Sequence, residues 1–398
     1  MRWMAVGLAV SVAGCSPPTS TAPSPGGAVA RPAPALSGDF AFGLYRELGR
    51  TEDNLFLSPV SIRAAFGLAQ AGARGETAAQ IERVIGLGNP ADAGALLRRL
   101  PIDEPGRRVT IANAVWVQTG YPLRPEYLRT VEASYGPVVR RVDFRRPLDA
   151  IGEINRWVEA NTAGRIRRLI DPNGFDPDTR LVLTNTVYFK ADWLQPFRAS
   201  GTAPDRFHAP GGRVLTTPFM RQRARFRLLD EDGFRAIELP YKGEELSMLL
   251  FLPDARDGLP AFEQGLDAAR LEGWIDALSR AEATFVDLAL PKLKLEARYD
   301  LEGPLSALGM PLAFSQRADF SGITDAEALT IGRAVHQTFL LVDETGTEAA
   351  AATGLEMVPV SAPPPATPFR ADHPFLLVIR DKRTGTDLFI GRVQEPRP

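Results

Sequence analysis

Apolar residues at helical spacing mark the first folded part of the chain. Phe40, Leu44 and Leu48 recur every four positions, which predicts a helix with one buried face. A second helix is predicted to begin at Ser58, because serine suits the cap position and Pro59 suits the first helical position. Later helices are predicted over residues 77–86 and 155–164, the last of them ending at Gly164.

Runs of apolar and β-branched residues predict the strands. One strand is predicted over Val109–Val117 around Trp116. Leu181–Trp193 is apolar almost without interruption, which predicts a central strand buried on both faces. Asn185 lies within this run and must therefore find hydrogen-bond partners. Other strands are predicted over residues 245–252, 284–295 and 334–342.

Four arginines alternate along another predicted strand and would share one of its faces. They could form a binding site for an acidic partner or a polyanion. They could also be a solvated strand face that protects a sheet edge, which is the interpretation we prefer. The four residues are Arg221, Arg223, Arg225 and Arg227.

The segment after the last predicted strand has an unusual pattern of small side chains. Read with a period of two, one set of positions is uncharged and small at its start, whereas the other carries both glutamates. Alanine favours a helix, and the alanine-rich run suits a strand poorly. A short helix, a flexible linker, and a loop that later becomes a strand all remain open. The uncharged set is Thr347, Ala349, Ala351, Thr353, Leu355 and Met357.

Composition and targeting signals define the ends of the fold. The 398 residues carry a net charge of −2 and are 44% hydrophobic, which gives no reason to expect nucleic acid as a partner. Arg2 precedes a short apolar run, which predicts a signal peptide over residues 1–14. Residues 15–36 are rich in Pro, Ser, Thr and Ala and predict a disordered tether. Residues 37–398, in which helices and strands alternate, are expected to form one mixed α/β domain.

Motifs for catalysis are lacking in the sequence. There are three histidines, His208, His336 and His373, and the chain has no G-x-S-x-G, H-E-x-x-H, C-x-x-C or P-loop pattern. We therefore expect a protein that is not an enzyme and that needs no cofactor and no metal. A nucleophile and a base brought together only by folding remain the alternative.

Several segments resemble those of one known family. Glu344–Thr353 resembles the reactive-loop hinge of inhibitory serpins. Phe369–Phe375, Ile379–Lys382 and Gly391–Val393 resemble the C-terminal signature of the same family. The resemblance extends from about Phe40 to Val393. It implies an α+β fold with three β-sheets, roughly nine helices and an exposed reactive-centre loop over about residues 344–368.

The resemblance also implies a function and a set of sites. Inhibitory serpins are suicide substrates: a serine protease is trapped as an acyl complex while the cleaved loop inserts into the central sheet. The reactive bond would be Val360–Ser361, with Met357 and Val358 as alternatives. The implied hinge residues are Glu344, Gly346, Thr347, Ala349, Ala351 and Thr353. The implied shutter is Ser58, Ser61, Asn185 and His336, and the implied breach is Trp193, Lys292 and Glu344.

The partner and the location remain to be chosen among alternatives. Val360 fits a shallow apolar pocket, so we expect an elastase-like protease first and a chymotrypsin-like one second. A non-inhibitory binding or chaperone module and an inhibitor of a cysteine protease are the other functions considered. Val12–Cys15 resembles the lipobox of bacterial lipoproteins, so we expect a monomer that is exported and anchored by a lipid on Cys15, facing the periplasm or the outside. A secreted protein is the alternative.

Overall fold

The helices confirm the mixed class predicted for the chain. The computed structural model describes residues 38–51, 53–88, 90–136, 138–172, 175, 179–326, 328–347 and 365–397, all within the unit Pro34–Pro398. Within these ranges, nine α-helices and three short 3₁₀ helices alternate with the strands. The α-helices are α1 (Gly38–Leu48), α2 (Pro59–Gly72), α3 (Gly75–Ile85), α4 (Pro90–Arg99), α5 (Pro125–Tyr135), α6 (Pro147–Asn161), α7 (Leu259–Gln264), α8 (Ala268–Arg280) and α9 (Glu302–Ala307). The 3₁₀ helices are η1 (Ala199–Gly201), η2 (Pro210–Gly212) and η3 (Pro311–Phe314).

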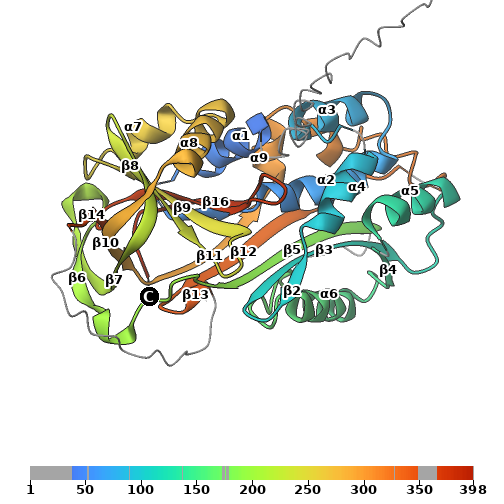
Figure 1. The fold of residues 1–398 in the computed structure, drawn as a ribbon. Helices are drawn as coiled ribbons and strands as arrows, with labels where there is room; N and C mark the ends of the chain where they lie inside the picture. The colour runs from blue at the N-terminus through green and yellow to red at the C-terminus, as the bar shows by residue number, and fades with distance from the viewer. Residues whose placement is uncertain are drawn as a thin grey trace, which may run out of the picture. The chain divides into compact units, whose positions relative to one another are not determined.

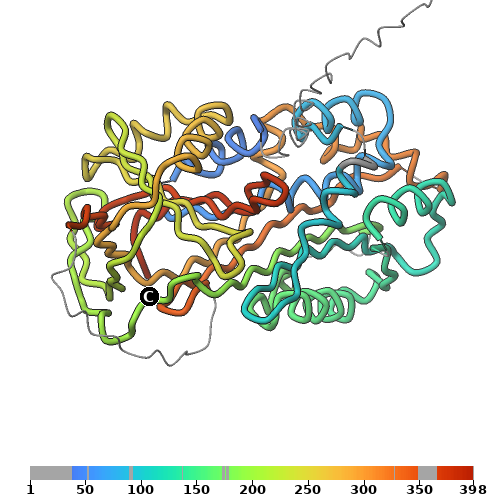
Figure 2. The backbone as a smooth tube through the Cα atoms, viewed as in Figure 1, coloured from blue at the N-terminus to red at the C-terminus, as the bar shows by residue number. Residues whose placement is uncertain are grey.

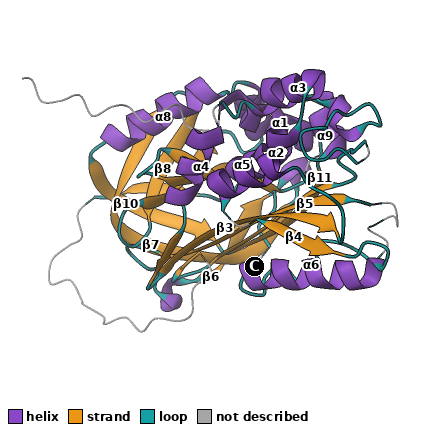
Figure 3. Cartoon of the chain, turned by 90° about the vertical axis from the view of Figure 1, so that its right-hand side faces the viewer, coloured by secondary structure: helices purple, strands orange, loops and turns teal. Residues whose placement is uncertain are grey.

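Seven of the strands form a sheet that we call the central sheet. Its strands follow the order β11 (Leu293–Asp300), β12 (Ala334–Val342), β13 (Gly346–Thr347), β5 (Leu181–Asp192), β3 (Arg107–Gln118) and β2 (Ile102–Glu104), with β4 (Val139–Val142) also paired to β3. Helix α6 covers one face of this sheet, and α2, α4 and α5 lie on the other side (Figures 1 and 3). Residues of β5 are buried almost throughout, as predicted for a central strand.

The remaining nine strands form a second sheet. Its order is β1 (Leu55–Leu57), β16 (Thr386–Val393), β15 (Phe375–Asp381), β9 (Leu246–Pro253), β8 (Phe234–Pro240), β7 (Val214–Glu231), β10 (Ala283–Pro291) and β14 (Thr367–Arg370), with β6 (Ala203–His208) paired to β7. The resemblance implies three sheets, whereas the described strands are linked into two. The reason is the 18-residue strand β7, which pairs with β6 and β10 along its first part and with β8 at its end.

Most predicted boundaries differ from the observed ones by one or two residues, and two predictions differ in a way that the local structure explains. The run 284–295, predicted as one strand, divides at Lys292 into β10 and β11, which belong to different sheets. Helix α6 ends at Asn161 and not at Gly164. The Thr162 hydroxyl donates to the Val158 carbonyl and accepts the Ile166 N–H, which turns the chain away from the helix axis.

The central sheet is incompletely paired along its middle. Strands β12 and β5 run parallel and pair only at Ala334–Leu183 and Val335–Thr184. At the other end the two-residue strand β13 lies between them. Among the described residues, no ladder pairing joins residues 336–341 to residues 185–190. In Figure 2 the trace of β12 can be followed beside that of β5 to the turn that leads into β13.

The described helices are all shorter than a membrane span. Within the described residues, no helix is long and apolar enough to cross a bilayer.

Candidate functional site

A tight turn carries the chain from β12 back into the central sheet. The Asp343 carboxylate accepts hydrogen bonds from the Thr345 N–H at 2.9 Å, the Thr345 hydroxyl at 2.7 Å and the Gly346 N–H at 3.3 Å. The Asp343 N–H donates to the Gly346 carbonyl at 2.9 Å. An aspartate that bonds the backbone two residues on is the usual local device for such a turn. The turn therefore directs the next residues towards β5.

Gly346 and Thr347 already form a strand of the central sheet. They pair antiparallel with Asp192 and Ala191 of β5, and Thr347 also pairs with Val342 of β12. A Cβ atom on Gly346 would lie 2.2 Å from the Ala191 carbonyl oxygen, so the approach to β5 requires glycine. The hinge residues Gly346 and Thr347 thus lie between the two strands that separate further along.

The Thr347 side chain is completely buried and meets the hydroxyl of Tyr241. Its exposed fraction is 0%, and its hydroxyl lies 2.7 Å from the Tyr241 hydroxyl. The Tyr241 ring stacks on Trp193 with 4.6 Å between ring centroids. The Trp193 indole N–H donates to the Asp343 carbonyl at 3.0 Å. Burial raises the pKa of Tyr241, and the Thr347 hydrogen bond offsets only part of this, so the phenol is neutral at physiological pH.

The three residues predicted for the breach lie together beside this turn. The Lys292 ammonium lies 2.8 Å from the Glu344 carboxylate, and the Thr202 hydroxyl donates to the same carboxylate at 2.8 Å. Burial would raise the pKa of Glu344, but hydrogen bonds from Lys292, the backbone and Thr202, together with the Lys292 charge, outweigh it and hold the pKa below its usual value. The Trp193 and Phe197 N–H groups donate to the Thr345 and Glu344 carbonyls. Side chains and backbone both fix the start of the hinge.

The four residues predicted for the shutter are all buried, but they do not form one network. His336 Nε2 accepts the Ser58 N–H at 3.0 Å. Burial lowers the pKa of His336 to about 3, so the imidazole is neutral and can accept this bond. The Ser58 hydroxyl, expected to cap α2, has no hydrogen-bond partner among the described residues, and neither has the Ser61 hydroxyl.

Asn185 forms a separate contact on the other side of the unpaired region. Its amide donates to the Asn113 side-chain oxygen of β3 at 2.6 Å, while its own oxygen has no partner among the described residues. Asn185 and His336 line the same small cavity of about 20 Å³. Asn113 in β3 and Tyr299, whose ring stacks on His336, were not predicted. Both reach the site from neighbouring strands, and no local pattern identifies them.

The remaining site residues predicted from sequence lie outside the described residues. They are Ala349, Ala351, Thr353, Met357, Val358, Val360, Ser361 and Cys15.

The alternating arginines lie on one face of β7 and make local contacts. Arg221 pairs with Asp205 at 2.6 Å and Arg227 with Glu238 at 3.0 Å. Arg225 donates to the Ala283 carbonyl at 2.8 Å and lies over the Phe285 ring. Each of these three arginines therefore has a partner within the protein.

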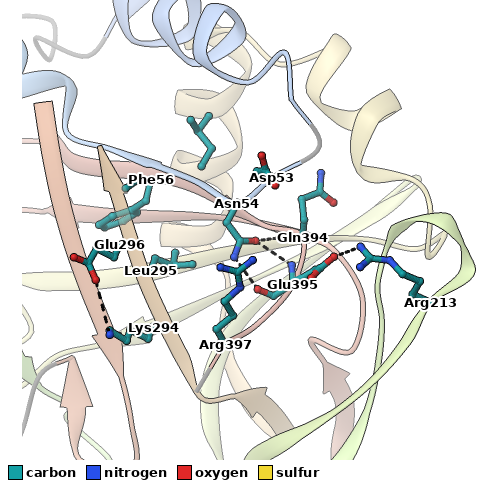
Figure 4. Close-up of a pocket in the computed structure, with 12 residues that line it drawn as sticks. Asp53, Asn54, Phe56, Arg213, Lys294, Leu295, Glu296, Gln394, Glu395 and Arg397 are labelled. Atoms are coloured by element: carbon teal, nitrogen blue, oxygen red, sulfur yellow. Dashed lines mark hydrogen bonds and ion pairs between the residues drawn. The ribbon is translucent and has the colours of Figure 1, made fainter. Parts of the chain in front are cut away.

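A polar cleft of about 420 Å³ lies beside β11 and the C-terminal residues (Figure 4). Its cations are balanced by acids: Arg213 pairs with Glu395, and Lys294 lies 3.8 Å from Glu296. Asn54 accepts the Glu395 N–H at 3.0 Å and ties the tail to β1. Within the described residues, no group of three or more His, Cys, Asp or Glu side chains could hold a metal. The hinge is therefore the stronger candidate site.

Known proteins share this fold and much of this sequence. The family described as serpin (serine protease inhibitor) matches residues 35–396. An uncharacterized serpin-like protein of Thermococcus kodakarensis is 43% identical over 369 residues, covering 90% of this chain and 84% of that protein. The leukocyte elastase inhibitor of Sus scrofa is 34% identical, covering 90% and 97%. The structure of human thyroxine-binding globulin with thyroxine superimposes with a TM-score of 0.82 at 29% identity, covering 92% and 98%.

The buried histidine predicts a pH-dependent stability. In the unfolded chain His336 has a pKa of 6.5 and binds a proton below that pH. In the folded chain burial lowers its pKa to about 3, so the proton binds only near that pH. Stability should thus be complete above pH 6.5 and fall as the pH drops towards 3, by about 2 kcal/mol at pH 5. The denaturant midpoint of the wild-type protein should fall between pH 7.5 and 5.0. In His336→Gln this fall should be smaller, because the contribution of His336 is absent. His208→Gln should keep it; equal shifts in all three proteins would contradict the assignment.

Proposed function

Because the chain belongs to the serpin family, we propose that it inhibits a serine protease by acting as a suicide substrate. Serpins are generally protease inhibitors and not enzymes. The observation that carries the proposal is the position of β13, two hinge residues already paired between β12 and β5 above an unpaired stretch of the sheet. A loop that continues from β13 could pair with the unpaired edges of both β12 and β5.

The unpaired stretch supplies the driving force for insertion. Backbone N–H and C=O groups that lack partners away from water raise the free energy of a fold. A strand that enters between residues 185–190 and 336–341 would pair with both sides at once. The uninserted state would then persist because insertion is slow, which makes its stability kinetic.

The side chains expected to follow Thr347 into the sheet are small. Thr347 is fully buried, and a strand alternates its side chains between faces. Ala349, Ala351 and Thr353 therefore share its face in the sequence pattern, and none is charged or bulky. This composition supports an inserting hinge.

The proposed chemistry uses the protease's own mechanism. The catalytic serine oxygen attacks the Val360 carbonyl carbon, the Val360–Ser361 bond breaks, and the amine of Ser361 takes a proton and leaves. Val360 remains as an ester on the protease. Insertion of the loop then pulls the ester away from the water that would hydrolyse it and distorts the protease active site.

The proposed target is an elastase-like protease, with a chymotrypsin-like one next. Val360 is small and uncharged and would leave the buried carboxylate of a trypsin-like pocket unpaired, which is costly. The similarity to the leukocyte elastase inhibitor of Sus scrofa supports this order. A cysteine protease remains a further target class, because its acyl intermediate could be trapped in the same way.

A binding function without inhibition is the second candidate. The similarity to thyroxine-binding globulin, whose structure contains thyroxine, favours it. One experiment separates the two functions: the purified protein is mixed with a panel of serine proteases and analysed by denaturing electrophoresis. An inhibitor gives a complex that survives boiling in detergent, and a binding module gives none with any protease.

We further propose that the protein is exported as a lipoprotein. The basis is the resemblance of Val12–Cys15 to a lipobox, with Cys15 the only cysteine of the chain. A single acyl chain binds a membrane only weakly, so stable anchoring would need several chains on Cys15.

The first prediction of the proposed function concerns the inserting face. Thr347→Arg should convert the inhibitor into a substrate, because a guanidinium buried without a partner at this position costs roughly 3–5 kcal/mol. Insertion should then be slower than hydrolysis of the ester, and cleaved protein should accumulate while the detergent-stable complex is lost. Glu348→Arg, on the opposite face of the pattern, is the matched control and should keep the complex. An undiminished complex yield with Thr347→Arg would show that another face inserts.

The second prediction concerns the reactive bond. The fragment released from the complex by an elastase-like protease should begin at Ser361. N-terminal sequencing or mass spectrometry of that fragment checks the position. A fragment that begins at Val358 would move the bond to Met357 and the favoured target to a chymotrypsin-like protease.

The third prediction concerns the anchor. The mature protein extracted from membranes should have an intact mass that starts at Cys15 and includes lipid. Cys15→Ser should release the protein from the membrane fraction or leave its signal peptide uncleaved. A wholly soluble wild-type protein with an unmodified N-terminus elsewhere would rule out the anchor.

A further inference from the structure

Tyr241 is held by backbone pairing next to the hinge although it belongs to the other sheet. It directly follows β8 and forms an antiparallel bridge with Trp193, the residue after β5. On either side of this bridge, the Leu194 N–H donates to the Pro240 carbonyl at 3.0 Å and the Lys242 N–H donates to the Asp192 carbonyl at 2.8 Å. The phenol therefore has a fixed position relative to the end of β5.

The polar group of the Tyr241 ring is its hydroxyl, for which the described residues offer one hydrogen-bond partner. The ring is fully buried between Trp193, which stacks on it, and Phe189, whose ring meets it edge-on at 5.3 Å. Its hydroxyl lies 2.7 Å from the Thr347 hydroxyl, which is buried as well. Buried hydroxyls without partners are unfavourable, so each of these two groups depends on the other.

Release of the hinge from the sheet would have different effects on the hydrogen bonding of the two hydroxyls. The Thr347 hydroxyl would move into water and be hydrated there. The Tyr241 hydroxyl, on a ring held by stacking and by the backbone bridge, would stay buried and lose its partner. The free-energy cost of leaving the Tyr241 hydroxyl buried without a partner therefore opposes release of the hinge.

We propose that Tyr241 is a positioning residue: its hydroxyl holds Gly346 and Thr347 in the central sheet, so that insertion of the loop starts from a strand already in place. Insertion of the loop competes with hydrolysis of the acyl ester. Because Gly346 and Thr347 are already in the sheet, fewer residues have to insert before the ester is hydrolysed. This kinetic role rests on the proposed inhibitory function, whereas the hold on the hinge does not.

Hydrogen exchange tests the hold on the hinge without any protease. Three amides report it, because their acceptors lie on the hinge turn: the Trp193, Phe197 and Asp343 N–H groups donate to the Thr345, Glu344 and Gly346 carbonyls. Tyr241→Phe leaves the Thr347 hydroxyl buried without a partner. These amides should then exchange about three to ten times faster, the range expected for loss of one buried hydrogen bond.

Two further variants separate the hydrogen bond from general loosening. Adding Thr347→Val to Tyr241→Phe removes both hydroxyls and should bring exchange part of the way back towards the wild-type rate, because no polar group is left unpaired although the hydrogen bond is still absent. Tyr127→Phe removes another buried tyrosine hydroxyl, which donates to the Leu68 carbonyl at 3.2 Å, and should leave the three amides unchanged. Unchanged exchange in Tyr241→Phe, or no recovery in the double variant, would overturn the proposal.

The same variants test the kinetic role. The measured quantity is the number of inhibitor molecules cleaved for each molecule of an elastase-like protease trapped. It should rise severalfold in Tyr241→Phe and return towards the wild-type value in the double variant. Faster exchange with an unchanged ratio would overturn the kinetic role. If the wild-type protein forms no stable complex with any protease of the panel, the inhibitory function fails, and the exchange experiment still decides whether Tyr241 holds the hinge.

Discussion

The unpaired stretch between β5 and β12 is the constraint on which the other features of this molecule depend. On their outer sides, residues 181–191 of β5 pair with β3 and residues 335–342 of β12 pair with β11. Among the described residues, only two pairs join β5 and β12 directly. An additional strand that pairs with both neighbours would supply partners for the backbone groups of this region. The hinge that follows β12 supplies the first two residues of that strand.

Each end of the unpaired stretch has its own polar contacts, and these differ in how completely they are satisfied. At the hinge end, Lys292, Thr202 and the Asp343 turn satisfy the polar groups around Glu344. At the other end, the hydroxyls of Ser58 and Ser61 and the Asn185 oxygen lack partners among the described residues. Unpaired buried groups lower the cost of separating the strands there. The structure thus combines a firmly held start of insertion with a weakly held region ahead of it.

The sequence predicted the elements whose signals are local and missed those that depend on distant contacts. Strand β12 was predicted with its observed bounds, because its apolar run ends at an acidic pair. The start of α2 followed from Pro59, yet the Ser58 hydroxyl does not cap it. The contact that Ser58 does make, from its backbone N–H to His336, lies 278 positions away along the chain. Tyr241 was missed because nothing in its neighbourhood indicates that it meets Thr347, 106 positions further along the chain. The continuity of β7 across two groups of strands was missed for the same reason.

The central claim is that the uninserted fold stores free energy that a strand between β5 and β12 would release. The most direct measurement is the denaturant midpoint of the protein before and after its loop is cut by a protease that is not trapped. Completion of the sheet by the cut loop would raise the midpoint well above that of the intact protein, because unpaired backbone groups become paired. A midpoint that stays the same or falls after cleavage would contradict this account.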